Sequence, residues 1–381
     1  MGFVVHLCAY IGVPVFGYDA PSLFDTAIFD EAGFGMACVR NRWLQVVVAV
    51  GLAFFCVRLF AAAEKAAGLP KEQVIDLEAA GAAYPFAVYS NIDLRHPDAG
   101  IQRAVVFVHG VQRDADRYFG VGLGLLQAAR LDASSTVLLV PHFLTASDAS
   151  PDPNIPLWGG GNWMQCQPSR GKEAVNSCGV LDDIARYLSA GKRFPVLKEI
   201  IFIGHSAGGQ LMQRYAVLNN SEESLRKAGI RVRYVVSSPS SYLYLDANRP
   251  EGGDFKPANS LLCPGYNNFR YGLANMVPYG QGLDGEQLFK RYAARQVLYL
   301  VGAEDNDPAY ESLDKSCGAA TQGTDRLDRH RNFMRYEQFL ARKWLTPVTR
   351  EAMVVPKAGH GAADIFESRD VAQKIFLAAS N

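Results

Sequence analysis

The stretch EIIFIGHSAGG at residues 199–209 joins a short apolar run to the pattern G-x-S-x-G, centred on Ser206. An apolar run of this length is typical of a strand buried in a parallel sheet, and a helical period over 208–219 follows it. A serine between such a strand and such a helix lies on a sharp turn that lifts its hydroxyl above the sheet. The stretch therefore predicts Ser206 as a nucleophile beside a helix N-terminus, which favours a developing negative charge.

A serine nucleophile of this kind needs an acid and then a histidine further along the chain. His360 lies between two glycines after an apolar run, where it can take the serine proton and return it to the leaving group. Three carboxylates compete for the acid, namely Glu304, Asp305 and Asp307. We favour Asp305, because it comes three residues after the glycine that ends the preceding run, and we expect it to orient His360.

An oxyanion site needs two N–H donors, one from the residue after the serine and one from the loop after an earlier strand. Ala207 supplies the first donor. The apolar run at 104–109 leads into a loop in which Val111 is the preferred second donor, followed by Gln112. We expect His109 to pack beneath this site rather than to take part in the reaction.

Apolar runs and helical periods alternate along most of the chain. The expected strands are 104–109, 136–140, 199–203, 232–237, 296–301 and 352–355. The expected helices are 122–131, 180–190, 208–219, 285–295 and 328–344. Such alternation implies β-α-β units and a doubly wound, mostly parallel α/β sheet.

Two spacers, 143–178 and 240–284, are longer than a sheet connection needs and are rich in aromatic residues. Long loops in compact domains are often functional, and ligands of open α/β sheets bind at the carboxyl edge. We therefore expect 240–284 to form a cap, or lid insertion, over the site. The aromatic side chains of the two spacers either contact the substrate or pack within the lid. The candidate substrate-binding residues are Trp158, Trp163, Tyr242 and Tyr244.

Composition excludes several classes of protein. The 381 residues carry 38 basic and 38 acidic side chains, for a net charge of zero, and 49% of them are hydrophobic. The chain is too apolar for a disordered protein, and it has no basic excess for a nucleic-acid backbone. No C-x-x-C, H-E-x-x-H or phosphate-binding glycine pattern is present. We therefore expect no metal, no cofactor and no nucleic-acid partner.

The N-terminal region contains an uncharged apolar run at 43–57, preceded by Arg40 and Arg42 and followed by Ala61-Ala62-Ala63. This arrangement is typical of a secretory signal with a small-residue cleavage site, although a membrane anchor or a buried helix would also fit. We interpret 1–35 as a leader of doubtful status and 36–63 as a signal peptide or anchor. Translation from Met36 would give a signal of normal size and a mature domain over 64–381.

Four cysteines lie in that domain, namely Cys166, Cys178, Cys263 and Cys317. Four cysteines allow three pairings. The nearest pair is Cys166 with Cys178, which leaves Cys263 with Cys317, and four free thiols are the alternative. An even number fits an oxidising compartment, so we expect an exported, periplasmic or secreted protein, with membrane anchoring through 43–63 as the alternative.

Taken together, the His109-Gly110 turn, the Gly204–Gly208 pattern, Asp305 and His360 resemble the α/β-hydrolase superfamily over residues 80–380. The aromatic loops are similar to those of a largely uncharacterised bacterial and fungal group of serine hydrolases. The resemblance implies an α/β-hydrolase fold and acyl transfer, with a small-molecule or polymeric ester as the expected substrate. Amidase, peptidase or acyltransferase activity with the same triad, or a non-catalytic binding protein on this fold, are the alternatives.

Overall fold

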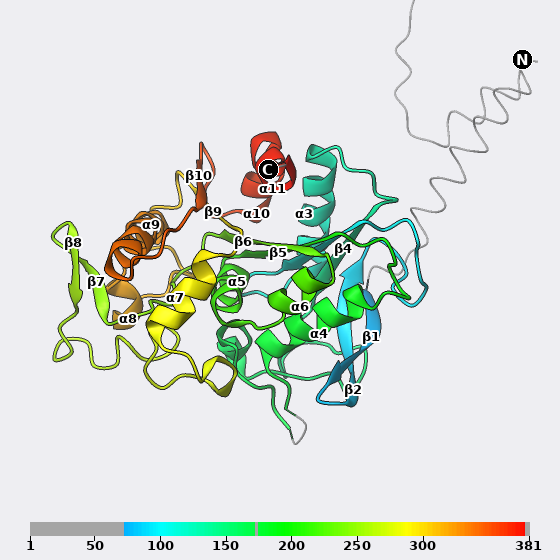
Figure 1. Cartoon of the computed structure of the whole chain (residues 1–381), viewed down its shortest axis with the longest axis horizontal. Helices are drawn as coiled ribbons and strands as arrows, with labels where there is room; N and C mark the ends of the chain where they lie inside the picture. The colour runs from blue at the N-terminus through cyan, green and yellow to red at the C-terminus, as the bar shows by residue number, and fades with distance from the viewer. Residues whose placement is uncertain (1–71, 172–173, 378–381) are drawn as a thin grey trace, which may run out of the picture. The chain divides into compact units, whose positions relative to one another are not determined.

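Eight strands form one mixed sheet in the computed structural model, which describes residues 72–171 and 174–377 (Figure 1). The strands are β1 (Glu72–Ala79), β2 (Ala82–Ser90), β3 (Arg103–Val108), β4 (Thr136–Pro141), β5 (Glu199–His205), β6 (Arg231–Ser237), β9 (Val297–Gly302) and β10 (Glu351–Val355). Their order across the sheet is β1-β2-β4-β3-β5-β6-β9-β10. The pairs β1–β2 and β2–β4 are antiparallel, and every other neighbouring pair is parallel. The carboxyl ends of β5, β9 and β10 therefore meet at one edge.

Helices cover both faces of this sheet, as Figure 1 shows. One face packs against α3 (Ala115–Ala128), α10 (Ala362–Phe366) and α11 (Arg369–Leu377). The other packs against α4 (Ser177–Ser189), α5 (Ala207–Leu218), α6 (Glu222–Lys227), α7 (Gly285–Ala293) and α9 (Arg326–Lys343). A hydrophobic core lies on each face of the sheet, and alternate residues of β3 point into one or the other. Phe107 packs on the side of α3, and Val106 packs on the opposite side. Burial on both faces explains why the central strands are apolar throughout.

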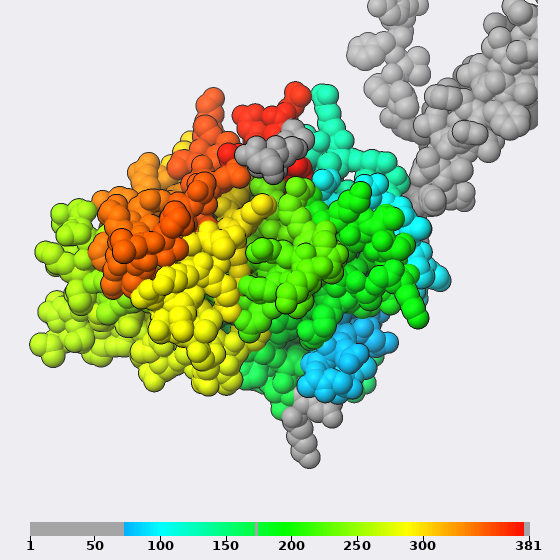
Figure 2. Space-filling model, viewed as in Figure 1, coloured from blue at the N-terminus to red at the C-terminus, as the bar shows by residue number. Residues whose placement is uncertain are grey.

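The smaller elements lie in the connections. They are η1 (Gly160–Gln165), the antiparallel hairpin of β7 (Asn248–Glu251) and β8 (Asp254–Pro257), η2 (Pro278–Gly280) and α8 (Cys317–Ala320). On the surface shown in Figure 2, α7 in yellow lies against α9 in orange. Beneath this surface, the ring of Phe289 on α7 packs against that of Trp344, which directly follows α9, with centroids 5.5 Å apart.

All six strands expected from the sequence are confirmed, with ends that differ by up to two residues. Helix α3 starts at Ala115 rather than at 122, and its first turns bury Tyr118 and Phe119. The glycines within the helix weaken its apolar periodicity, so the sequence did not show this start. The hairpin β1–β2 and the C-terminal helices α10 and α11 were not expected. β1 alternates buried and more exposed residues, so it gives a weaker signal than a continuous apolar run.

The two cysteine pairings agree with the expected ones. Disulfides join Cys166 to Cys178 and Cys263 to Cys317. The first ties the end of η1 to the first turn of α4, and the second ties 240–284 to α8. The predictions for 1–35 and 36–63 lie outside the described residues. Within the described ranges, no helix has the length and hydropathy required to span a membrane.

Candidate active site

Ser206 occupies the turn between β5 and α5, in a strained backbone conformation. Its φ of 57° and ψ of −116° place it where a residue with a side chain is rarely found. A Cβ atom at Gly204 would collide with the backbone of Gly208, and one at Gly208 would collide with the carbonyl of Val108. The glycines are therefore required by contact, and the predicted sharp turn is confirmed.

Ser206, His360 and Asp305 form a continuous hydrogen-bonded chain. His360 Nε2 lies 2.9 Å from Ser206 Oγ, and His360 Nδ1 lies 2.8 Å from Asp305 Oδ2. An ionised carboxylate only accepts, so Nδ1 carries the proton and Nε2 accepts from the serine hydroxyl. Ser206 is 6% exposed and Asp305 is 4% exposed. The three residues follow β5, β10 and β9, whose parallel ends share one edge of the sheet.

Neither competing carboxylate is hydrogen-bonded to His360 in the described part of the chain. Asp307 is exposed and accepts a hydrogen bond from the backbone N–H of Ala309 at 2.8 Å. Glu304 is also exposed. Burial raises the pKa of Asp305, but its hydrogen bond to His360 and the nearby positive charges outweigh this effect and lower that pKa below its usual value. Of the three candidates, Asp305 is therefore the one whose carboxylate contacts His360.

The loop after β3 brings Val111 to the same pocket as Ser206. The N–H of Val111 makes no hydrogen bond within the described part of the chain, and Ala207, as the first residue of α5, has an N–H that its own helix cannot pair. Arg113 Nη1 donates to the Val111 carbonyl at 3.2 Å. The same guanidinium forms a two-point ion pair with Asp148, at 2.6 and 2.9 Å, which fixes the loop.

His109 packs beneath this loop, as expected from the sequence. The backbone N–H of Phe143 donates to His109 Nε2 at 3.1 Å, so Nδ1 carries the proton and donates to the Gly110 carbonyl at 2.9 Å. Burial lowers the pKa of His109 to about 3. The imidazole is therefore neutral and committed to backbone contacts on both of its nitrogens.

A pocket of about 150 Å³ opens over Ser206. Its lining residues come from the loop after β3, the start of α3, the Ser206 turn and the loops after β9 and β10: Gly110, Val111, Gln112, Asp114, Arg117, Tyr118, His205, Ser206, Tyr310, Ser312, His360, Gly361 and Ala362. The Tyr310 ring meets the His360 ring edge-on at a centroid distance of 5.1 Å. Tyr310 is 40% exposed, so it forms part of the pocket rim.

The aromatic residues proposed as substrate contacts line no part of this pocket, which corrects that expectation. Trp158, Trp163, Tyr242 and Tyr244 are each 0% exposed. Trp163 stacks on Phe143 beside His109, and the tyrosines pack against α9. Large aromatic side chains stabilise a fold most when they are fully buried. An aromatic residue in a long loop looks the same in the sequence whether it packs in the core or binds a substrate.

Residues 240–284 likewise do not form the expected cap over Ser206. None of them lines the pocket. The segment begins with the buried stretch 240–245 and continues through the β7–β8 hairpin, which lies at the end of the domain beside α8 and α9 (Figure 1). Its aromatic side chains extend the hydrophobic core instead of covering the carboxyl edge of the sheet.

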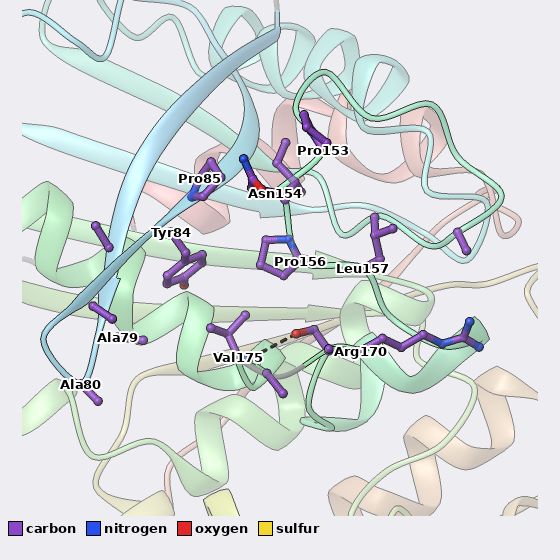
Figure 3. Close-up of a pocket in the computed structure, with 17 residues that line it drawn as sticks. Ala79, Ala80, Tyr84, Pro85, Pro153, Asn154, Pro156, Leu157, Arg170 and Val175 are labelled. Atoms are coloured by element: carbon purple, nitrogen blue, oxygen red, sulfur yellow. Dashed lines mark hydrogen bonds between the residues drawn. The ribbon is translucent and has the colours of Figure 1, made fainter.

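A separate cavity of about 790 Å³ lies elsewhere among the described residues. Figure 3 shows it between Tyr84 and Pro85 of β2, the segment containing Pro156 and Leu157, and Val175. It shares no lining residue with the pocket at Ser206, and none of the described residues that line it is a histidine, an aspartate or a glutamate. This cavity is larger than the pocket at Ser206. Of the two, the pocket at Ser206 is the candidate active site, because it contains a serine hydroxyl hydrogen-bonded to a histidine.

A model of the alpha/beta hydrolase family matches residues 105–373, well over half of the chain. The chain belongs to the alpha/beta hydrolase family. This hydrolase has the family's mostly parallel sheet, with β5 running into the Ser206 turn. The matched segment includes Val111, Ser206, Asp305 and His360.

Two solved structures are similar to this hydrolase in fold. Poly(aspartic acid) hydrolase-1 from Sphingomonas sp. KT-1 has 17% identity and a TM-score of 0.55, over 81% of this chain and 99% of that one. LpqC, the poly(3-hydroxybutyrate) depolymerase from Bordetella parapertussis, has 20% identity and a TM-score of 0.56, over 82% and 92%. A search of curated proteins gave no match.

Sequence reasoning missed Arg326, Tyr310 and Ser312 at this site. Arg326 is 1% exposed and lies 3.4 Å from Asp305. No local pattern marks it, because a basic residue in the first turn of a helix is ordinarily solvated. Among the described residues, no group of three or more histidine, cysteine or carboxylate side chains is arranged to hold a metal ion.

Proposed function

We propose that this protein is a serine hydrolase that cleaves an ester through an acyl-enzyme on Ser206. His360 takes the Ser206 proton as the hydroxyl attacks the carbonyl, and it then protonates the leaving alkoxide. Asp305 keeps His360 in the required tautomer and stabilises the imidazolium. The N–H groups of Val111 and Ala207 bind the oxyanion. Water, activated by His360, releases the acid in the second step.

One observation carries this proposal: the unbroken hydrogen-bonded chain from Ser206 Oγ through His360 to Asp305, at a strained turn above the sheet. Nucleophile, base and orienting acid are each within hydrogen-bond distance, which is the geometric requirement for an activated serine. We favour an ester over an amide substrate because an alkoxide leaves more readily than an amine.

The pocket supports a short acyl group. Its volume of about 150 Å³ is below the range of about 300–1,000 Å³ that holds drug-sized ligands. Tyr118 of α3 and Tyr310 of the loop after β9 both line it. We therefore expect the larger part of the substrate, whether a small molecule or a polymer, to remain outside the pocket.

We also propose that the protein is exported, with membrane anchoring through residues 43–63 as the alternative. The two disulfides support this proposal, because such bonds persist mainly in oxidising compartments. N-terminal sequencing of the protein from its native host tests it. A mature chain that starts near Glu64 would support export, and a chain that keeps 43–57 in the membrane fraction would support the anchor.

The catalytic proposal is tested by labelling with a fluorophosphonate and mapping the modified peptide by mass spectrometry. The label should be found on Ser206 in the wild-type protein and should be absent from Ser206→Ala. A panel of 4-nitrophenyl esters from acetate to decanoate should show a preference for the shortest chains, while matched anilides should be cleaved poorly. Labelling at another serine, retained in Ser206→Ala, would contradict the proposal.

A further inference from the structure

A buried guanidinium lies on the far side of Asp305 from His360. Arg326 is the first residue of α9, and its Nη1 is 3.4 Å from Asp305 Oδ1. The next N–H of the helix, that of Leu327, donates to the Asp305 backbone carbonyl at 3.1 Å. The start of α9 is therefore joined to Asp305 through both the side chain and the main chain.

The same guanidinium supports the wall of the pocket. Arg326 Nη2 donates to Ser312 Oγ at 3.1 Å, and the guanidinium carbon lies 5.0 Å from the centroid of the Tyr310 ring. Tyr310 and Ser312 both line the pocket at Ser206, and Tyr310 contacts His360. One side chain thus connects the carboxylate that faces His360 with two residues that line the pocket at Ser206.

The charge of Arg326 matters because Asp305 is buried and has few charged neighbours. The described ionisable groups that face it are His360 after β10, His205 at the end of β5, Tyr242 after β6 and Arg326 on α9. Burial lowers the pKa of His205 to about 3 and raises that of Tyr242 well above its usual value, so both are uncharged at neutral pH. A buried carboxylate without a positive neighbour tends to take up a proton.

We propose that Arg326 is a positioning residue that acts through Asp305, keeping its carboxylate ionised and aimed at His360 while holding Tyr310 and Ser312 against the pocket. This inference rests on the proposed function, since it assumes that His360 is the base. Arg326 itself does not touch the reacting atoms. Its contribution is to fix the carboxylate in the charge state and direction that the imidazolium needs.

Arg326→Gln removes the charge and keeps much of the side-chain length. We expect kcat for a short-chain ester to fall about 10- to 100-fold, because small misplacements of reacting groups have effects of this size. The acid limb of the kcat/KM profile, which belongs to the coupled Asp305–His360 pair, should move upward by about one pH unit. The positive charge of Arg326 lowers the pKa of Asp305, so its loss favours the protonated carboxyl, which sets the direction.

Arg329→Gln is the matched control. Arg329 lies one turn further along α9 and is 2% exposed, but among the described residues its guanidinium donates to backbone carbonyls, those of Gly323, Ser240 and Asp314. Its loss should lower the melting temperature without moving the acid limb. Arg326→Lys keeps the charge, so it should return the acid limb toward its wild-type position and also provides a folded variant if Arg326→Gln does not fold.

An acid limb in Arg326→Gln and Arg326→Lys that matches the wild type, with loss of stability alone as in Arg329→Gln, would overturn the inference. Fluorophosphonate labelling separates this outcome from failure of the proposed function. If Ser206→Ala abolishes labelling while Arg326→Gln has the wild-type pH profile, only the role of Arg326 is wrong. If Ser206→Ala keeps its labelling and activity, the proposed function itself is wrong.

Discussion

His205 Nε2 lies 2.9 Å from the backbone carbonyl oxygen of His360, so the residue before Ser206 also holds the loop that carries the opposing imidazole. A carbonyl can only accept, so Nε2 carries the proton of His205. Its Nδ1 then accepts from the hydroxyl of Ser237, 3.0 Å away. The Ser206 turn and the His360 loop are thereby fixed relative to each other by one buried side chain.

Replacing His205 should affect catalysis through this contact. His205→Phe fills a similar volume but cannot donate to the His360 carbonyl, so we expect kcat for a short-chain ester to fall about 10- to 100-fold. Ser237→Ala removes only the contact at Nδ1 and should have a smaller effect. Equal kcat values in His205→Phe and the wild type would show that the carbonyl contact does not position His360.

The two nearby aspartates should differ sharply in their effect on activity. Asp305→Asn should lower kcat by about 10⁴-fold, because an amide favours the wrong tautomer of the imidazole. Asp307→Asn should stay close to wild type, because Asp307 is exposed and its carboxylate accepts a hydrogen bond from the N–H of Ala309, which an amide oxygen can also accept. Steady-state kinetics on one ester, with circular dichroism to verify folding, measures both. A more damaging Asp307→Asn would contradict the assignment.

Tyr242 should behave as a core residue. Its ring stacks on Phe333 with centroids 4.3 Å apart, and it is fully buried. Tyr242→Ala should therefore lower the free energy of unfolding by about 3–5 kcal/mol and leave the ester chain-length preference unchanged. Tyr310→Ala is the comparison, because it opens the pocket rim and should extend the preference toward longer acyl chains. Urea unfolding and the ester panel distinguish the two residues.

Acidification should destabilise the fold through His109. Burial holds its pKa at about 3 in the folded protein, against about 6.5 for an unfolded chain. Between these values the unfolded state binds a proton that the folded state does not, so His109 should reduce the unfolding free energy by about 1.4 kcal/mol for each unit that the pH falls. The contribution of neutral His109 to the unfolding free energy is fully present above pH 6.5, and it stops falling near pH 3.

Urea unfolding of His109→Phe and the wild type across this range measures that contribution. The variant should be less stable at neutral pH, because it loses two buried hydrogen bonds, but its stability should fall less steeply with acid. His96→Gln, at an exposed position, should follow the wild type. Parallel slopes for His109→Phe and the wild type would contradict the prediction.

Both disulfides should stabilise the fold, and the one that closes the longer loop should stabilise it slightly more. Cys263 and Cys317 are 54 residues apart, and Cys166 and Cys178 are 12 apart. The chain-entropy model gives about 4 kcal/mol for the longer loop and about 3 kcal/mol for the shorter one. Paired serine replacements, unfolded in urea, measure each contribution. No change in stability for either pair would show that the bonds do not constrain the unfolded chain.

The sequence alone determined the central strands and the Ser206 turn. Both depend on local physics: strands covered on both faces must be apolar throughout, and the close approach of Gly208 to the Val108 carbonyl admits no side chain. The order of Ser206, Asp305 and His360 also followed, because residues after parallel strands converge at one edge of the sheet. These features can be recognised in the sequence without knowing which helices pack against which strands.

Tertiary structure alone decided the functions of side chains whose partners are far away in the chain. Burial of Tyr242 depends on α9, about 90 residues further along, and the same aromatic residue in a loop could equally have faced a substrate. Arg326 meets Asp305 because the start of α9 folds back to the end of β9, and no local pattern distinguishes it from a solvated arginine. Contacts between distant segments are set by the packing of whole elements, which the sequence specifies only collectively.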